Sequence, residues 1–184
     1  MELTEMKNEV CLDSQEIWLE DIMTEYGNKM IRVAYSYIKD WGISQEIVQE
    51  VFITCYKNYS QYSKAKNFKA LIYKITINRS KDVLRSSFVK KVFVGTDIFA
   101  SHKSSDLSPE NLVLKSDESA LIAASILSLP LKYRETIHLF YYENLSILEI
   151  SQMLNVNQNT LKSRLKRSRT MLGNILERNE TYER

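Results

Sequence analysis

Apolar residues recur every three or four positions along most of the chain, and this periodicity limits the possible folds more than any other feature. In the first half it marks four amphipathic segments, at residues 17–26, 30–38, 47–55 and 71–84. The 184 residues include only 4 Gly and 2 Pro, too few for the many tight turns of a β-sandwich or barrel. The sequence therefore predicts an all-α fold.

The chain is long enough for two small domains. Residues 86–116 lose the helical period and collect Ser, Asp, Lys and Pro, a composition typical of a flexible linker. We therefore expect two small helical domains, with the first over residues 14–86, a linker over 87–116 and the second over 117–178.

Within the first domain, the breaks between helices are expected where the apolar period is interrupted. These positions are Gly27, Asp40 to Ser44 and Ser60 to Asn67. Ser44 and Asn67 are expected to cap the helices that follow, because short polar side chains accept hydrogen bonds from the first free amides of a helix.

The second domain has the pattern of a helix-turn-helix. Helices are expected over Asp117 to Leu127 and Pro130 to Glu143, followed by a short helix that a Ser146–Glu149 capping box opens. That helix is expected to end near Asn155, a residue type that readily adopts the left-handed conformation of a turn. A last helix follows, from Gln158 to about Arg178.

The outward face of this last helix is polar and basic, with five positive charges in ten residues and no acid. A helix in the DNA major groove uses polar side chains for base edges and basic ones for phosphates. The alternative is a basic helix that binds no nucleic acid. The residues expected on this face are Gln158, Asn159, Thr160, Lys162, Ser163, Arg164, Lys166, Arg167 and Arg169.

A second basic block lies within the first domain. Formal net charge is only +2, but residues 62–91 carry 9 basic and 1 acidic side chain. Between Tyr56 and Phe68, aromatic residues are interleaved with Lys64 and Lys66, as expected of a site that stacks and holds single-stranded DNA. The alternative is that these tyrosines belong to the helical core.

Five stretches together resemble bacterial sigma factors of the sigma-70 family, in particular the extracytoplasmic function (ECF) group, which retains only the second and fourth conserved regions. Residues 46–52 are similar to that family's D-x-V-Q-E-x-F stretch, and residues 68–78 to its F-x-x-W-L-Y-R-I-A-x-N helix, with Leu71 in place of Trp. The other three matches are residues 109–112, 129–135 and 145–169.

The resemblance implies a promoter-specificity subunit of RNA polymerase that helps to open promoter DNA, in a stress or envelope response. The first domain would dock on the clamp helices of the largest polymerase subunit through Glu46, Gln49 and Glu50. The melted minus-ten strand would contact Tyr62, Lys64, Lys66, Tyr73, Lys74 and Asn78. The minus-thirty-five element would contact Thr160, Lys162, Ser163, Arg164, Lys166 and Arg167.

The same resemblance implies further partners. They are the flap of the second-largest polymerase subunit and an anti-sigma factor that holds the chain inactive. No cofactor or metal is expected. Neither His102 nor His138 is beside a nucleophile or a paired carboxylate, so no enzyme activity is predicted.

Other readings of the sequence remain open. One is a helix-turn-helix regulator whose first domain senses a ligand or dimerises, and another is a recombinase-like enzyme with a helix-turn-helix tail. Membrane insertion is not expected, because the longest uncharged stretch, Ser119 to Leu131, has 13 residues where a span needs about 20. A cytoplasmic location is expected, with Cys11 and Cys55 as unreactive thiols.

Overall fold

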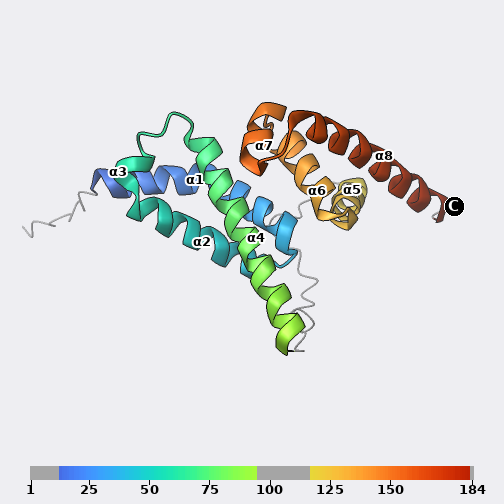
Figure 1. Ribbon diagram of the computed structural model, residues 1–184, viewed down its shortest axis with the longest axis horizontal. Coiled ribbons are helices and arrows are strands. Elements are labelled where there is room, and N and C mark those ends of the chain that lie inside the picture. Colours follow the sequence, from blue (N-terminus) through green and yellow to red (C-terminus); the bar gives the residue numbers. More distant parts are fainter. Residues whose placement is uncertain (1–12, 95–116, 183–184) are drawn as a thin grey trace, which may run out of the picture.

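The computed structural model describes the backbone of residues 13–94 and 117–182, and the side chains of residues 13–86 and 120–178. Every regular element in these ranges is helical (Figure 1). The first domain contains α1 (Ser14–Ile38), α2 (Trp41–Lys57), α3 (Tyr59–Tyr62) and α4 (Phe68–Val94). The second contains α5 (Asp117–Ser128), α6 (Leu131–Ile137), the π-helical turn η1 (His138–Tyr142), α7 (Ile147–Leu154) and α8 (Gln158–Tyr182). The predicted all-α fold with two small helical domains is confirmed.

The core of the first domain lies where α1, α2 and α4 pack together. Met30 and Val33 of α1 are fully buried beside Val51 and Cys55 of α2 and Ile72 of α4. These side chains occupy the positions at which the sequence repeats its apolar residues. Burial raises the pKa of the Cys55 thiol to about 11, so the thiol stays protonated near neutral pH.

One expected break and one expected cap in the first domain are wrong. Gly27 lies inside α1, which continues without interruption because Tyr26 and Met30, on either side of it, are both buried in the core. That packing outweighs a helical glycine's cost of about 1 kcal/mol. The cap of α2 is Asp40, whose carboxylate accepts a hydrogen bond from the Ile43 amide at 2.8 Å. Ser44 is a buried residue of that helix.

Helix α4 begins where the sequence predicted but ends later than expected. The Asn67 side chain accepts from the Ala70 amide at 3.0 Å, which confirms the predicted cap. The helix α4 then continues to Val94, eight residues past the expected domain boundary at 86. Neither glycine nor proline occurs between Phe68 and Val94, so no residue type in this stretch breaks the helix. The rest of the expected linker, residues 95–116, lies outside the described residues.

In the second domain, the segment from Pro130 to Glu143 was expected to form one helix, but it changes from α-helical to π-helical geometry. Helix α6 ends at Ile137, and the π turn η1 follows it, with the Glu143 amide donating to the carbonyl of His138 at 3.2 Å. The predicted capping box is confirmed: the Glu149 amide donates to the Ser146 hydroxyl at 3.2 Å, and the Ser146 amide donates to the Glu149 carboxylate at 2.8 Å.

The turn between α7 and α8 is held by two local features. Asn155 adopts the left-handed conformation, with φ of 54°, as its residue type predicts. The Ser151 hydroxyl donates to the carbonyl of Val156 at 2.7 Å and so bridges the turn. Together they fix the angle at which α8 leaves α7.

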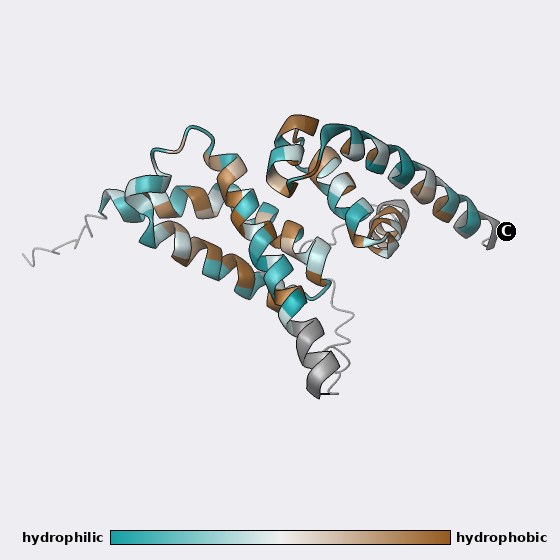
Figure 2. Cartoon of the chain, in the orientation of Figure 1, coloured by the Kyte–Doolittle hydropathy of each residue, from teal (hydrophilic) through white to brown (hydrophobic). Residues whose placement is uncertain are grey.

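The two domains pack against each other. Helix α1 contacts α6 and η1, and α4 contacts α7. One continuous cluster of buried apolar side chains includes Ile72, Tyr73 and Ile77 of α4 together with Leu139 and Ile150 of the second domain. In Figure 2 the outer side of α8, away from this contact, is mostly hydrophilic.

Candidate nucleic-acid and polymerase interfaces

Helices α7 and α8 form the predicted helix-turn-helix. Leu161 and Leu165 of α8 are buried, as are Ile150 and Met153 of α7, so the apolar sides of the two helices hold the unit together. Most of the predicted contact residues lie on the opposite, solvent-exposed side of α8. The exposed ones are Thr160, Lys162, Ser163, Lys166 and Arg167.

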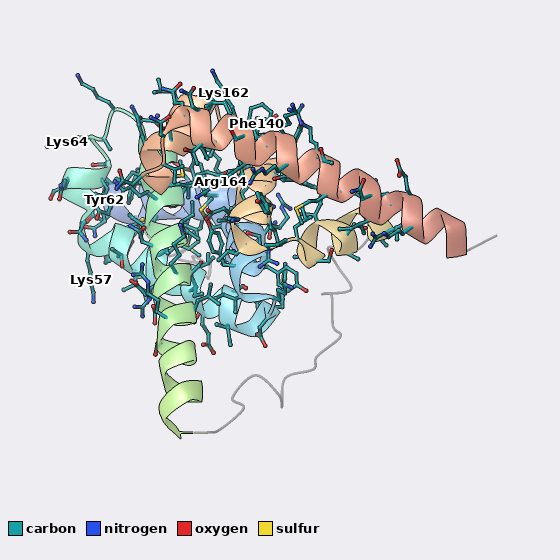
Figure 3. All side chains as sticks on the ribbon, turned by 45° about the vertical axis from the view of Figure 1, so that its right-hand side comes forward. Lys57, Tyr62, Lys64, Phe140, Lys162 and Arg164 are labelled. Atoms are coloured by element: carbon teal, nitrogen blue, oxygen red, sulfur yellow. The ribbon has the colours of Figure 1, made fainter. Side chains whose placement is uncertain are left out.

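Arg164 departs from this pattern. Its side chain is only 22% exposed, and its Nη1 lies 3.3 Å from Oε1 of Glu135. In Figure 3, Lys162 extends outward from α8, whereas Arg164 is turned back toward the body of the protein. Arg164 is therefore partly neutralised by a carboxylate of its own domain.

The residues predicted to hold the minus-ten strand fall into two groups. The lysine side chains of the loop before α4 and two polar side chains of α4 are exposed: Lys64, Lys66, Lys74 and Asn78. The two tyrosines, in contrast, are less accessible to solvent. Tyr62 is half-buried against the core, and Tyr73 is fully buried. Figure 3 shows Lys64 on the loop, beyond Tyr62.

Aromatic side chains of α1, α3 and α4 pack together beside this loop. Trp18 of α1 makes edge-to-face contacts with Tyr59 and Phe68, each with ring centroids 5.3 Å apart, and Tyr26 makes a similar contact with Phe68 at 5.8 Å. Such pairs add about 0.5–1.5 kcal/mol each beyond the area that they bury. Most aromatic residues of this region thus position the loop, and its exposed charge comes from the lysines.

The Tyr73 hydroxyl donates a short hydrogen bond to the Glu143 carboxylate, and Lys69 Nζ donates to the Glu143 carbonyl at 3.2 Å. His138 Nε2 lies 3.3 Å from the other carboxylate oxygen. Burial alone would raise the pKa of Glu143, but the facing His138 and Tyr73 outweigh it and hold that pKa below its ordinary value. Glu143 is thus an ionised, buried acid that joins the two domains.

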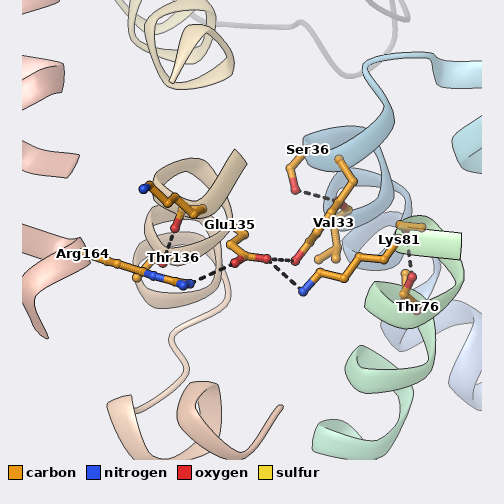
Figure 4. Close-up of polar contacts among 10 residues, drawn as sticks. Val33, Ser36, Thr76, Lys81, Glu135, Thr136 and Arg164 are labelled. Carbon is orange, nitrogen blue, oxygen red and sulfur yellow. Dashed lines mark hydrogen bonds and ion pairs between the residues drawn. The ribbon is translucent and has the colours of Figure 1, made fainter. Parts of the chain in front are cut away.

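A second buried acid, Glu135 of α6, lies between three partners (Figure 4). Its Oε2 accepts a hydrogen bond from the Tyr37 hydroxyl at 2.8 Å and lies 3.2 Å from Lys81 Nζ, while its Oε1 faces Arg164. Burial and the nearby carboxylate raise the pKa of Tyr37 well above its ordinary value, so this phenol remains a donor. Neighbouring Arg134 donates from Nε to the Ser36 carbonyl at 2.5 Å.

Sequence reasoning did not assign a role to either acid. Glu135 belongs to the stretch that resembles a family motif, and Glu143 ends a predicted helix. Their partners are 98 and 70 positions away in the chain, so no local spacing signals the pairs.

The predicted polymerase-docking residues Glu46, Gln49 and Glu50 are exposed on one side of α2. Ile53, one turn further on, is 53% exposed, which is unusual for a large apolar side chain. Glu50 forms an ion pair with Arg79 of α4. A shallow pocket beside them is lined by Glu50, Val51, Ile53, Thr54, Ile75 and Arg79. This face combines an apolar centre with a charged rim, as protein interfaces do.

Across residues 13–94 and 117–182, no helix is both long and apolar enough to cross a membrane. Over the same part of the chain, no group of three or more His, Cys, Asp or Glu side chains is placed to hold a metal ion.

The two domains each match a known family model. Residues 22–87 match "Sigma-70 region 2", and residues 119–172 match "Sigma-70, region 4". The chain therefore belongs to the sigma-70 family, whose members direct bacterial RNA polymerase to promoters and are not enzymes.

Relatives define the group within this family. The chain is 30% identical over 159 residues to the ECF RNA polymerase sigma factor SigW of Bacillus subtilis, covering 83% of this chain and 85% of the relative. It is 26% identical over 161 residues to the ECF sigma factor SigM of the same organism, covering 87% and 96%. The chain is thus an ECF RNA polymerase sigma factor, and the resemblance read from the sequence is confirmed.

Solved structures share the fold. The sigma factor RpoE of Bartonella quintana, in complex with the anti-sigma factor NepR, has a TM-score of 0.66 at 18% identity, covering 86% of this chain and 96% of that one. CnrH, in complex with the cytosolic domain of CnrY, has a TM-score of 0.61 at 18% identity, covering 86% and 87%.

Proposed function

We propose that the exposed side of α8 reads the minus-thirty-five element of the promoter. The observation that supports this best is the combination of a helix-turn-helix core with five exposed polar or basic side chains on one side of its second helix. In this proposal Thr160 and Ser163 contact base edges, and Lys162, Lys166 and Arg167 contact phosphates. Arg164 instead orients α8 against Glu135.

The minus-ten role falls to the loop before α4 and to the adjoining surface of that helix. Lys64, Lys66 and Lys74 supply exposed positive charge along a path that a single-stranded backbone can follow. Asn78 adds a hydrogen-bonding side chain on α4. Tyr73 can stack on a base only after it leaves Glu143, so it is assigned to this site in an opened form of the protein.

The α2 face is assigned to polymerase docking. Exposed Ile53 would anchor the contact with the clamp helices, and Glu46 and Gln49 would surround it with polar contacts. The second domain would contact the polymerase flap and, in the inactive state, both domains would contact an anti-sigma factor. The protein would act in the cytoplasm, in a response to stress or to envelope damage.

Run-off transcription with purified bacterial core polymerase on a genomic promoter library tests the whole proposal. Discrete starts that depend on the chain and share two spaced elements are expected. Glu46→Lys should abolish them by weakening core binding, whereas Glu20→Lys, the same change at an exposed site on α1, should not. Binding of the chain alone to duplex DNA without any new start would instead favour an ordinary helix-turn-helix regulator.

A further inference from the structure

Tyr133 of α6 lies where this helix packs against α8. The fully buried Ser168 of α8 has its hydroxyl 3.4 Å from the carbonyl oxygen of Tyr133. The ring of Tyr133 packs against the apolar cluster of the second domain, as do Met171 and Leu172 of α8. Both the backbone and the ring of Tyr133 are therefore fixed relative to the turn of α8 that contains Arg167.

The hydroxyl of Tyr133 faces cations. Arg167, as a hydrogen-bond donor to the phenol oxygen, and then Lys132 hold the pKa of Tyr133 below its ordinary value. The Nζ of Lys132 lies 5.0 Å from the centroid of the same ring. Arg167 is exposed, and none of the ion pairs among residues 13–86 and 120–178 involves it. The phenol is thus an acceptor for Arg167 that does not neutralise it.

The preceding turn of α8 shows the other possible arrangement. Arg164 faces the carboxylate of Glu135 at 3.3 Å, and this pair offsets its charge. A carboxylate acceptor orients a guanidinium but also weakens its attraction for a phosphate, whereas a neutral phenol orients it without that loss. Helix α6 therefore offers different acceptors to two arginines of α8, and of the two only Arg167 keeps its full charge.

We propose that Tyr133 is a positioning residue, which holds Arg167 toward the DNA backbone and leaves its charge available to a phosphate. The inference rests on the phosphate contact that the proposed function assigns to Arg167. A long arginine side chain loses much of its rotamer freedom when it binds a ligand, and this loss weakens the contact. Because Tyr133 already orders Arg167 in the free protein, less of the loss falls on DNA binding.

A double-mutant cycle in DNA binding tests this role. Affinity is measured by fluorescence anisotropy with the full-length chain and a mixed-sequence duplex of about 30 base pairs. Tyr133→Phe keeps the ring but removes the acceptor oxygen, and it should weaken binding about fivefold. In an Arg167→Gln background the same change should have no further effect. In the matched Lys166→Gln background it should again weaken binding about fivefold.

The salt dependence of binding separates positioning from charge. Arg167→Gln should lower the slope of log affinity against log salt by about 1, whereas Tyr133→Phe should leave the slope unchanged, because the charge remains. An equal loss of affinity from Tyr133→Phe in the Arg167→Gln background, or no loss in the unmodified protein, would overturn the role of Tyr133. An unchanged slope for Arg167→Gln would instead show that Arg167 contacts no phosphate, so the proposed contact fails and the inference with it.

A second measurement needs no DNA. 3-Fluorotyrosine is incorporated at position 133 alone, and its fluorine resonance is followed as pH rises. The titration midpoint should be higher in Arg167→Gln, since the guanidinium holds the pKa of the phenol down, and unchanged in the matched control Lys166→Gln. The same midpoint in Arg167→Gln and in the unmodified protein would overturn the contact. Circular dichroism establishes that each variant is folded, and this titration decides the question if Tyr133→Phe is not.

Discussion

Two basic residues of α8, Arg164 and Lys166, have the same formal charge but very different surroundings. Lys166 is exposed on the side assigned to DNA, whereas Arg164 is paired with Glu135 at 3.3 Å. Both members of this pair belong to the second domain, so the pair does not depend on the contact between the two domains. We therefore predict that Lys166 contributes to the salt dependence of DNA binding and that Arg164 does not.

The magnitude follows from counterion release. Each phosphate contact in duplex DNA adds about 0.9 to the slope of log affinity against log salt. Raising the salt from about 50 to about 200 mM should therefore weaken each contact by about 3.5-fold. Lys166→Gln should lower the slope by about 1, and Arg164→Gln, a matched loss of one charge, should leave it unchanged.

The assay is fluorescence anisotropy with the full-length chain and a duplex of mixed sequence of about 30 base pairs, titrated at four salt concentrations between these limits. Circular dichroism of both variants controls for loss of structure. The reasoning is refuted if Arg164→Gln lowers the slope as much as Lys166→Gln does, because the carboxylate of Glu135 would then not neutralise the guanidinium.

Three further predictions concern stability. Gly27→Ala should raise the free energy of unfolding in urea by up to about 1 kcal/mol, since an added Cβ meets nothing within 4 Å in α1; a decrease would contradict the open space seen there. Leu161→Ala should lower the stability by about 2–5 kcal/mol and abolish promoter-specific starts, because this fully buried side chain joins α8 to α7; full activity in run-off transcription would argue against that packing. The pKa of Glu143 is lower in the folded protein than its ordinary value, so the ionised carboxylate stabilises the fold above the ordinary carboxyl pKa, and this contribution is lost as pH falls through the lowered value. The difference in melting temperature between the unmodified protein and Glu143→Gln should therefore shrink below about pH 4. A constant difference down to about pH 3 would contradict this.

Local signals in the sequence predicted much of the second domain. The Ser146–Glu149 capping box and the left-handed Asn155 depend on residues close together in the chain, so they can be read directly. The exposed face of α8 also followed from its helical period and charge, except for Arg164. Its pairing with Glu135, 29 positions away, is visible only once the helices are packed.

Tertiary packing decided the features that the sequence did not predict. Gly27 is a weak helix former, but the burial of residues on both sides of it continues α1. Tyr73 was predicted to contact DNA because of the family resemblance, and in the structure it is buried, with apolar neighbours and a carboxylate from the second domain. A position whose exposure depends on a distant domain cannot be assigned from its own neighbours in the sequence.

The shared contact between α4 and the second domain also limits how freely the two domains can be exchanged between relatives. A chimera that joins this first domain to a foreign region 4 lacking either acid would leave Lys81 or Tyr73 of α4 without the carboxylate that it faces here. Unless both sides of the contact are transplanted together, the hybrid would carry unmatched charges there and rest in a different domain arrangement. The two halves of this sigma factor are therefore less modular than their separate DNA targets would imply.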